Sequence, residues 1–330
     1  MLTPNCNRCV MNNLSRFGTV LGHDGFNRSK LWMYGTVTSR NNPQAKDFLL
    51  SRPHWVRNLI APREGMALVA CDVTGAEDWL AAGFSGDPEL MRIYSSGADS
   101  YMEFASVTGA VTPGTKRDKN NKELEAIRAQ HKTAKLSIAY GVGGETLRKY
   151  LGVPLWQAQH IVNSHKQAYA VYWQWVDDQA KLAEERGYVE TDFGWRQSIE
   201  HMNYNSILNF PQQAGCAELL RCASILLIDS GWGYALAAPH HDAIYLHVEA
   251  ERAEKCKTVV ENAFIEAGDI IMGLPEFPLR VHAELVYHPN HYEDPDGAEI
   301  WDIVCKYFGW DKFAISEEEK PDETLLTYSR

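Results

Sequence analysis

Apolar positions recur along the chain with the periods of both strands and helices. The apolar run 67–72 ends in Asp72 and has the length of a buried strand. Apolar residues three or four apart predict a helix over 123–140, which a glycine-rich segment ends. The same criteria predict further helices at 79–94, 155–186, 211–229 and 250–267, and strands at 188–191 and 278–287.

Two short apolar runs in the second half of the chain predict a β-hairpin with a polar tip. The runs 234–239 and 244–248 are joined by the His-His-Asp segment 240–242. An acid at the end of a buried strand is costly unless it is paired or binds a cation. Asp72 and Asp242 would together suit two Mg²⁺ ions, although each alone is more often a turn cap, and their spacing does not show that they meet.

One face of the predicted helix 123–140 carries two cations and an aromatic ring. Arg128, Lys132 and Tyr140 follow one another at steps of four and eight residues. A guanidinium and an ammonium one turn apart suit a triphosphate, and the aromatic ring suits a stacked base. Taken alone, the helix is more simply interpreted as a solvated basic face.

Composition narrows the class of protein. The chain has 330 residues, of which 45% are hydrophobic and 23% charged, as in globular proteins with about two domains. No apolar run approaches the ~20 residues of a membrane helix, and the N-terminus has no secretory signal pattern. Seven scattered cysteines argue for a reducing compartment, so we expect a cytoplasmic location, in a bacterial or phage-infected host cell.

The charge distribution is compatible with local binding of nucleic acid in spite of the negative net charge. The net charge of −11 argues against a nucleic-acid coat protein. Residues 116–149, in contrast, contain nine basic and four acidic residues.

Three motifs, in order, resemble the family A DNA polymerases of the DNA polymerase I type. Residues 72–77, Asp-Val-Thr-Gly-Ala-Glu, and the following 84–88 resemble the first palm motif. Arg128, Lys132 and Tyr140 resemble the fingers-helix motif, and His241-Asp242 resemble the second palm motif. The connecting segments 152–159, 187–196 and 209–213 also match the family pattern, so that the resemblance covers about residues 35–290.

The resemblance implies an α+β fold, with a palm built on an antiparallel or mixed sheet and a helical fingers subdomain. It divides the chain into an irregular N-terminal segment, two parts of the palm on either side of the fingers, and an acidic tail. The corresponding ranges are 1–34, then 35–120 (palm), 121–186 (fingers), 187–310 (palm) and 311–330 (tail).

The resemblance also implies a DNA-directed DNA polymerase core that adds dNTPs to a primer 3′ end by two-metal-ion phosphoryl transfer. Asp72 and Asp242 would hold two Mg²⁺ ions, or Mn²⁺ in their place, and Lys132 would be the general acid. Glu77 would exclude a ribose 2′-hydroxyl. The implied nucleotide-binding residues are Arg128, Lys132, Leu136, Tyr140 and Glu77, and the implied primer–template residues are Arg40, Arg57, Gln213 and His241.

The chain departs from the family pattern at several points. Ala243 follows the His-Asp pair where many members have glutamate, and Leu136 replaces an aromatic residue. The segment before the resemblance is too short for a thumb, so we expect a divergent, phage-like member that lacks an evident thumb. It is either a fragment, a split polymerase or a natural thumbless form. Its expected partners are primer–template DNA, dNTPs and a separate thumb, processivity or exonuclease chain.

Two alternatives to a polymerase remain open from the sequence. One is a catalytically weak, polymerase-derived accessory protein that binds primer–template, and the other is a different two-metal phosphotransferase or nuclease. Cys6 and Cys9 are either half of a zinc site or two free thiols.

Overall fold

The computed structural model describes most of the chain, namely residues 26–28, 30–44 and 48–310. The predicted tail 311–330, most of the predicted segment 1–34, and Cys6 with Cys9 lie outside these residues. In the described part of the chain, no helix combines the length and the apolar character that crossing a membrane requires.

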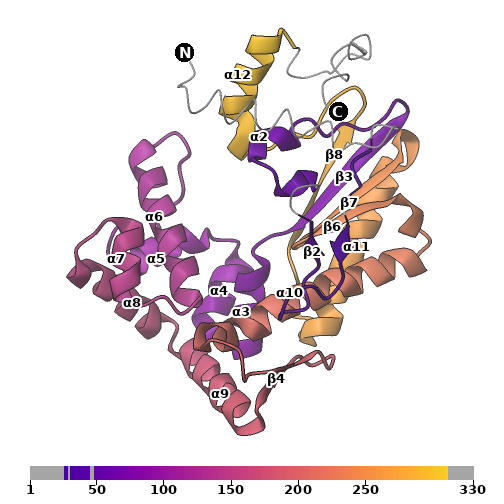
Figure 1. The fold of residues 1–330 in the computed structure, drawn as a ribbon. Coiled ribbons are helices and arrows are strands. Elements are labelled where there is room, and N and C mark those ends of the chain that lie inside the picture. The colour runs from indigo at the N-terminus through magenta and orange to yellow at the C-terminus, as the bar shows by residue number, and fades with distance from the viewer. Residues whose placement is uncertain (1–25, 29, 45–47, 311–330) are drawn as a thin grey trace, which may run out of the picture.

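A four-stranded antiparallel sheet occupies the right-hand part of Figure 1. Its strand order is β6-β7-β3-β8, so β3, early in the chain, pairs on both sides with strands from the second half. The strands are β3 (Met66–Val73), β6 (Leu236–His240), β7 (Ala243–Glu249) and β8 (Val281–Tyr287). The expected α+β fold is confirmed, with an antiparallel sheet.

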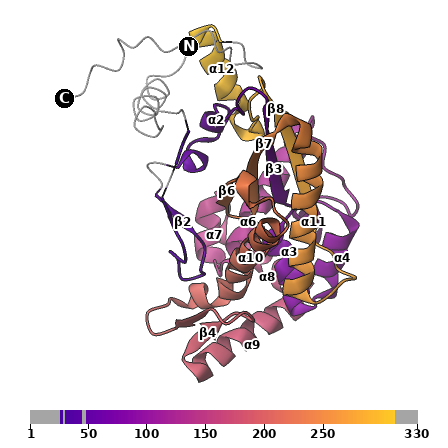
Figure 2. The ribbon, with the colours of Figure 1, turned by 90° about the vertical axis from the view of Figure 1, so that its right-hand side faces the viewer.

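One face of this sheet packs on α11 (Ala253–Met272), which in turn packs on α10 (Tyr204–Asp229) (Figure 2). Strand β7 alternates accordingly: Ile244 and Leu246 are fully buried and Tyr245 only half-buried. Burying each such aliphatic side chain contributes roughly 1.5–3 kcal/mol. In β3, Cys71 and Val73 join the same core, so the two-residue period of the strand places Asp72 on the opposite face, where it is exposed at the strand end.

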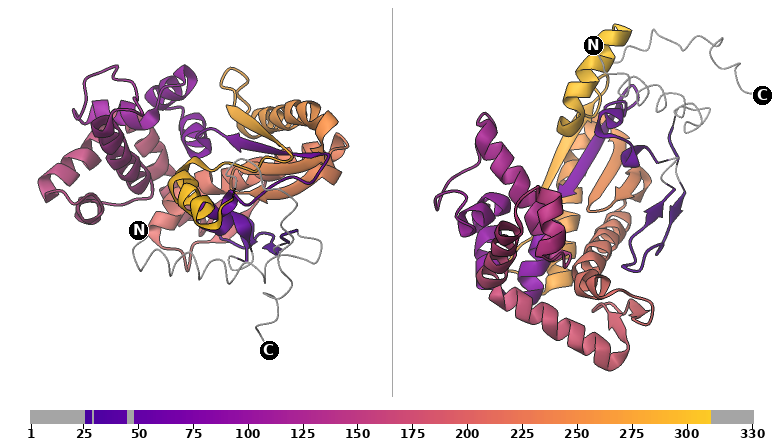
Figure 3. Two further views of the ribbon diagram at one scale, coloured as in Figure 1. Left: turned by 90° about the horizontal axis from the view of Figure 1, so that it is seen from above. Right: turned by 60° about the vertical axis from the view of Figure 1, so that its left-hand side comes forward.

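A group of helices lies beside the sheet (Figures 1 and 3). Four of them, α5 to α8, contact one another, whereas α9 packs against α3 and α10. Helices α3 and α4 lie between this group and the sheet (Figure 1). Their bounds are α3 (Ala76–Ser85), α4 (Pro88–Ser96), α5 (Ser100–Val107), α6 (Lys122–Ala139), α7 (Gly144–Leu151), α8 (Leu155–Ala168) and α9 (Ala170–Arg186).

Smaller elements complete the described structure. Helices α2 and α12 form a separate small core around Trp55 and Trp301. The remaining elements are β1 (Leu31–Trp32), β2 (Asn42–Pro43), β4 (Tyr188–Glu190), β5 (Arg196–Ser198), α2 (His54–Arg57) and α12 (Ala298–Phe308), with short 3-10 helices at Leu49–Ser51, Gly233–Ala235, Ala250–Arg252 and Pro295–Gly297.

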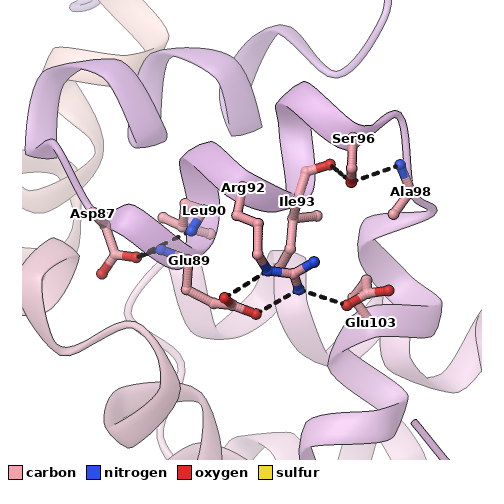
Figure 4. Close-up of polar contacts among 8 residues, drawn as sticks. All are labelled: Asp87, Glu89, Leu90, Arg92, Ile93, Ser96, Ala98 and Glu103. Carbon is pink, nitrogen blue, oxygen red and sulfur yellow. Dashed lines mark hydrogen bonds and ion pairs between the residues drawn. The ribbon is translucent and has the colours of Figure 1, made fainter. Parts of the chain in front are cut away.

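The helix predicted at 79–94 is instead two helices, α3 and α4. Gly86 ends α3 with a φ of 64°, a left-handed conformation that glycine adopts at no steric cost. The Asp87 carboxylate then accepts hydrogen bonds from the backbone N–H groups of Glu89 and Leu90 and begins α4 (Figure 4).

The guanidinium of Arg92 links α4 to α5. Arg92 donates to both carboxylate oxygens of Glu89 on its own helix and to Glu103 on α5 (Figure 4). The three side chains are partly exposed to solvent, so this link between α4 and α5 adds little stability.

The helix predicted at 155–186 is also two helices, α8 and α9, which break at Tyr169. Its ring is fully buried, and its ψ of 52° does not continue the helix. The second carboxylate oxygen of Asp87 accepts the backbone N–H of Tyr172 at 3.0 Å and caps the start of α9. One buried aspartate therefore begins two helices that are distant in sequence.

The helix predicted at 211–229 begins earlier, at Tyr204, because Asn203 caps it by accepting the N–H of Ser206 at 2.9 Å. Pro211, which was expected to open the helix, lies inside it. The predicted helix at 250–267 is likewise displaced and appears as α11.

Candidate active site

Strand pairing brings the two predicted catalytic carboxylates to neighbouring strand ends. Asp72 lies opposite Ala243 in the β3–β7 register. The backbone N–H of Val73 donates to the carbonyl oxygen of Asp242 at 3.2 Å. The end of β3 and the tip of the β6–β7 hairpin therefore form one acidic edge.

The electrostatics of this edge disfavour two negative charges. The surrounding protein and the nearby carboxylates of Asp242 and Glu284 raise the pKa of Asp72 to about 7, although the residue is exposed at the strand end. Burial also raises the pKa of Asp242. Two carboxylates that are costly to ionise together are a donor set that a divalent cation would stabilise, and oxygen ligands are those Mg²⁺ prefers.

The two histidines at the hairpin tip are held in defined positions. His241 is exposed and has a φ of 56°. His240 is half-buried, its ring lies 5.0 Å from that of Phe48 in an edge-to-face contact, and burial lowers its pKa to about 3. His240 is therefore neutral, and His241 is the imidazole that the tip presents to solvent.

A second set of predicted residues meets through hydrogen bonds. Glu77 in the first turn of α3 accepts a hydrogen bond from Arg40 at 3.1 Å and from the hydroxyl of Tyr140, at the end of α6, at 2.9 Å. Burial raises the pKa of Tyr140 to about 12, with Glu77 adding to the effect and a hydrogen bond from Gln213 opposing it. The segment with Arg40, the start of α3, the end of α6 and α10 therefore meet around the Glu77 carboxylate.

A cavity of about 270 Å³ adjoins this cluster. Tyr140 and Gln213 form one part of its wall, and Asn209 on α10 another. The remaining lining residues are Thr36, Val37, Thr38, Asn205 and Ser206.

The cationic face of α6 forms one wall of a larger cavity of about 310 Å³. Arg128 and Lys135 of α6 line this cavity together with Thr74 and Gly75, which follow Val73 at the end of β3. The Nε of Arg128 donates to Asp99 at 2.6 Å. Lys132 is exposed, and within the described residues its ammonium group has neither an ion-pair nor a hydrogen-bond partner. Leu136, one turn further on, is half-buried.

Arg57 is the predicted residue that the structure places in a different setting. Its guanidinium donates to Asp294 at 3.0 Å, and the same carboxylate oxygen contacts Nδ1 of His54 at 2.9 Å. His54, Asp294 and Asp296 have the residue types of a metal site. Because Arg57 already compensates Asp294, we interpret this group as an ion-pair network between α2 and the segment before α12.

Sequence reasoning missed four residues that organise the cationic face, namely Asp78, Asp99, Ser100 and Lys135. Lys135 is buried and donates to Asp78 at 2.7 Å. Burial disfavours the Asp78 carboxylate, but the ammonium group of Lys135 outweighs it and lowers the pKa of Asp78. An Asp-Ser pair before a helical pattern is a helix-start signal that could have identified Asp99.

The strand ends thus carry two carboxylates, and Arg128 of α6 lines a cavity that begins at Thr74, two residues after Asp72. Carboxylates and cations are the side chains that phosphate chemistry with divalent cations requires. The family model of DNA polymerase family A matches residues 42–287. The chain therefore belongs to DNA polymerase family A, which confirms the resemblance of its motifs.

Similar sequences include bacterial and phage polymerases. The thermostable DNA polymerase I of Thermus filiformis is 26% identical over 263 residues, which cover 73% of this chain and 30% of that protein. DNA polymerase I of Aquifex aeolicus is 28% identical (69% and 40% covered), and the DNA polymerase of Mycobacterium phage D29 is 24% identical (66% and 35% covered). The chain thus spans well under half the length of these relatives.

A solved structure shows the same fold. The POL domain of Pol1 from M. smegmatis, in complex with DNA primer-template and dNTP, matches with a TM-score of 0.72 and 19% identity. The match covers 86% of this chain and 51% of that one.

Proposed function

We propose that this chain is the palm and fingers of a DNA-directed DNA polymerase, with the sheet as palm and the helices around α6 as fingers. It would add dNTPs to the 3′ end of a primer on a DNA template. The observation that carries the proposal is the position of Asp72 and Asp242 at neighbouring strand ends, with a cavity lined by Arg128 beginning at Thr74, two residues after Asp72. Membership of family A and the fold shared with a primer–template complex support it.

Asp72 and Asp242 would hold two Mg²⁺ ions, or Mn²⁺ in their place. When bound there, the ions supply activation of the primer 3′-hydroxyl and neutralisation of the leaving pyrophosphate. Arg128 and Lys132 would bind the triphosphate, and the ammonium group of Lys132 would donate a proton to the leaving group.

The remaining residues would orient the substrates. Tyr140 would stack near the nascent base pair, with Glu77 against the sugar edge so that a ribose 2′-hydroxyl is excluded. Leu136 would pack near the sugar 3′ position. Arg40, Gln213 and His241 would contact the primer–template end. Arg57, on α2, would also contact the primer–template.

A primer-extension assay tests the proposal. The chain should extend a labelled primer on a DNA template with dNTPs and Mg²⁺ or Mn²⁺, and the double variant D72A/D242A should not. Primer–template binding without extension by the unchanged chain would instead support a polymerase-derived binding protein. Template-independent phosphate transfer or strand cleavage would indicate a different two-metal enzyme.

A further inference from the structure

The first turn of α5 holds the cationic face of α6 through three consecutive residues. Asp99 accepts the backbone N–H groups of Tyr101 and Met102 with one carboxylate oxygen. Its other oxygen accepts the Nε of Arg128 at 2.6 Å. Within the described residues, the two terminal nitrogens of Arg128 have no hydrogen-bond partner, so that both remain available to an anion in the cavity.

Ser100 completes a second link to the same face. Its hydroxyl donates to one oxygen of Asp78 at 2.7 Å, and the other oxygen accepts from Lys135, also at 2.7 Å. The side chain of Lys135 is only 5% exposed. This pair links α6 to α3 and α5, and the two charges compensate each other before any ligand arrives.

Tyr101 provides the third link, through the face of its ring. The Arg128 guanidinium carbon lies 5.0 Å from the ring centre. The ammonium nitrogens of Lys132 and Lys135 lie at 5.9 and 5.8 Å. Cations at such distances are attracted by the negative face of an aromatic ring. Within the part of the chain that the structure describes, this ring is the one partner of the Lys132 ammonium group.

We propose that Tyr101 is a positioning residue for triphosphate binding, whose ring holds Arg128, at the wall of the cavity, and Lys132, one turn further along α6, before the nucleotide arrives. The inference rests on the proposed polymerase function. Tyr101 lines the same cavity as Arg128. A long cationic side chain that is already oriented loses less conformational freedom on binding, which strengthens binding without a new contact. Asp78 and Asp99 do not repel the phosphates strongly, because each is already paired with a cation.

The test compares three variants in steady-state primer extension at saturating primer–template. Tyr101→Leu removes the ring, Tyr101→Phe keeps it without the hydroxyl, and Tyr150→Leu is the control, since Tyr150 is an exposed aromatic residue on α7. We expect Tyr101→Leu to raise the KM for dNTP by about five- to thirtyfold, on the order of the cost of ordering two long cationic side chains only when the nucleotide binds. The kcat, the primer–template affinity and the melting temperature should change little, and Tyr101→Phe should restore the KM.

An unchanged KM in Tyr101→Leu would overturn the inference, and so would a Tyr101→Phe variant as impaired as Tyr101→Leu. A second measurement separates this inference from the proposed function: dNTP binding to the complex with a dideoxy-terminated primer. If the unchanged chain bound dNTP more tightly than Tyr101→Leu but extended no primer, the polymerase proposal would fail and the role of Tyr101 would stand. If it bound no dNTP at all, both would fail.

Discussion

Two neighbouring regions of the site treat charge in opposite ways. We call the strand ends with Asp72 and Asp242 the palm wall, and α6 with the residues that it contacts in α3 and α5 the fingers wall. On the palm side, Asp72 lies beside other carboxylates, and its pKa is raised to about 7. On the fingers side, the Asp78 carboxylate has a lowered pKa, because Lys135 compensates its burial. A compensated charge is part of the framework, whereas an uncompensated one marks a place where an external ion would be stabilised.

The same contrast occurs within α6. Lys135 is buried and paired, whereas Lys132, one turn earlier on nearly the same face, is exposed, and among the described residues its ammonium group has the Tyr101 ring as its one partner. Two lysines of one helix therefore have different tasks. Removing Lys135 should loosen the fold, and removing Lys132 should weaken the reaction.

The largest effect should come from the palm wall. Asp72→Ala and Asp242→Ala should each reduce primer extension by a hundredfold or more, on the order of what removing groups that act on the reacting atoms costs. The matched control is Glu284→Gln, which removes a neighbouring negative charge on β8. If either alanine variant retained near-normal extension, or if the Glu284 variant lost as much, the two carboxylates would have no special role.

Lys132→Ala should have the next largest effect. One charge-assisted contact to a phosphate is worth roughly 1.5–3 kcal/mol, or about ten- to a hundredfold in nucleotide incorporation. Loss of the proton donor would add to this. The exposed Lys122 of the same helix provides the control variant, Lys122→Ala, which should incorporate normally. Equal losses of DNA affinity and incorporation in Lys132→Ala would make this lysine a general DNA contact.

Replacing Glu77 tests its proposed role in excluding a ribose 2′-hydroxyl. Glu77→Ala should lower the preference for dNTP over rNTP by at least about tenfold, because the space beside the sugar becomes open. Glu77→Gln keeps the size of the side chain and a group that can accept the Tyr140 hydroxyl, so it should retain most of the preference. The measurement is single-nucleotide incorporation of dNTP and rNTP by each variant. An unchanged preference in Glu77→Ala would remove this residue from the sugar site.

Sequence patterns located the ends of the apolar runs, and so Asp72 and Asp242, but could not show that they meet. Their proximity depends on the pairing of β3 with β7, which is a property of the folded sheet. The antiparallel character of the sheet was likewise left open, because the strands that pair with β3 are distant in sequence.

The features that sequence patterns missed share one physical origin: a side chain that forms a hydrogen bond with a residue distant in sequence. Asp87 begins α4 by local capping, which sequence can reveal, but it also caps α9 through Tyr172. No local pattern contains the second contact, so α8 and α9 were predicted as one helix. The pair of Lys135 with Asp78 was missed for the same reason.

The smallest expected effect concerns the stability of the metal-free protein. The pKa of Asp72 rises from its ordinary value of 3.8 to about 7 on folding, so the folded state binds a proton more readily than the unfolded state. This group therefore favours folding at low pH, and its contribution is lost as the pH rises through about 7. Asp72→Asn removes the ionisation, so it should raise the melting temperature at pH 8, with a chelator present, by more than at pH 5. Because the residue is exposed and water screens its charge, the gain should be only on the order of a few degrees. Adding Mg²⁺ at pH 8 should raise the melting temperature of the unchanged protein and not that of the variant. Equal gains at both pH values would show that repulsion between ionised carboxylates is not what distinguishes the palm wall from the fingers wall.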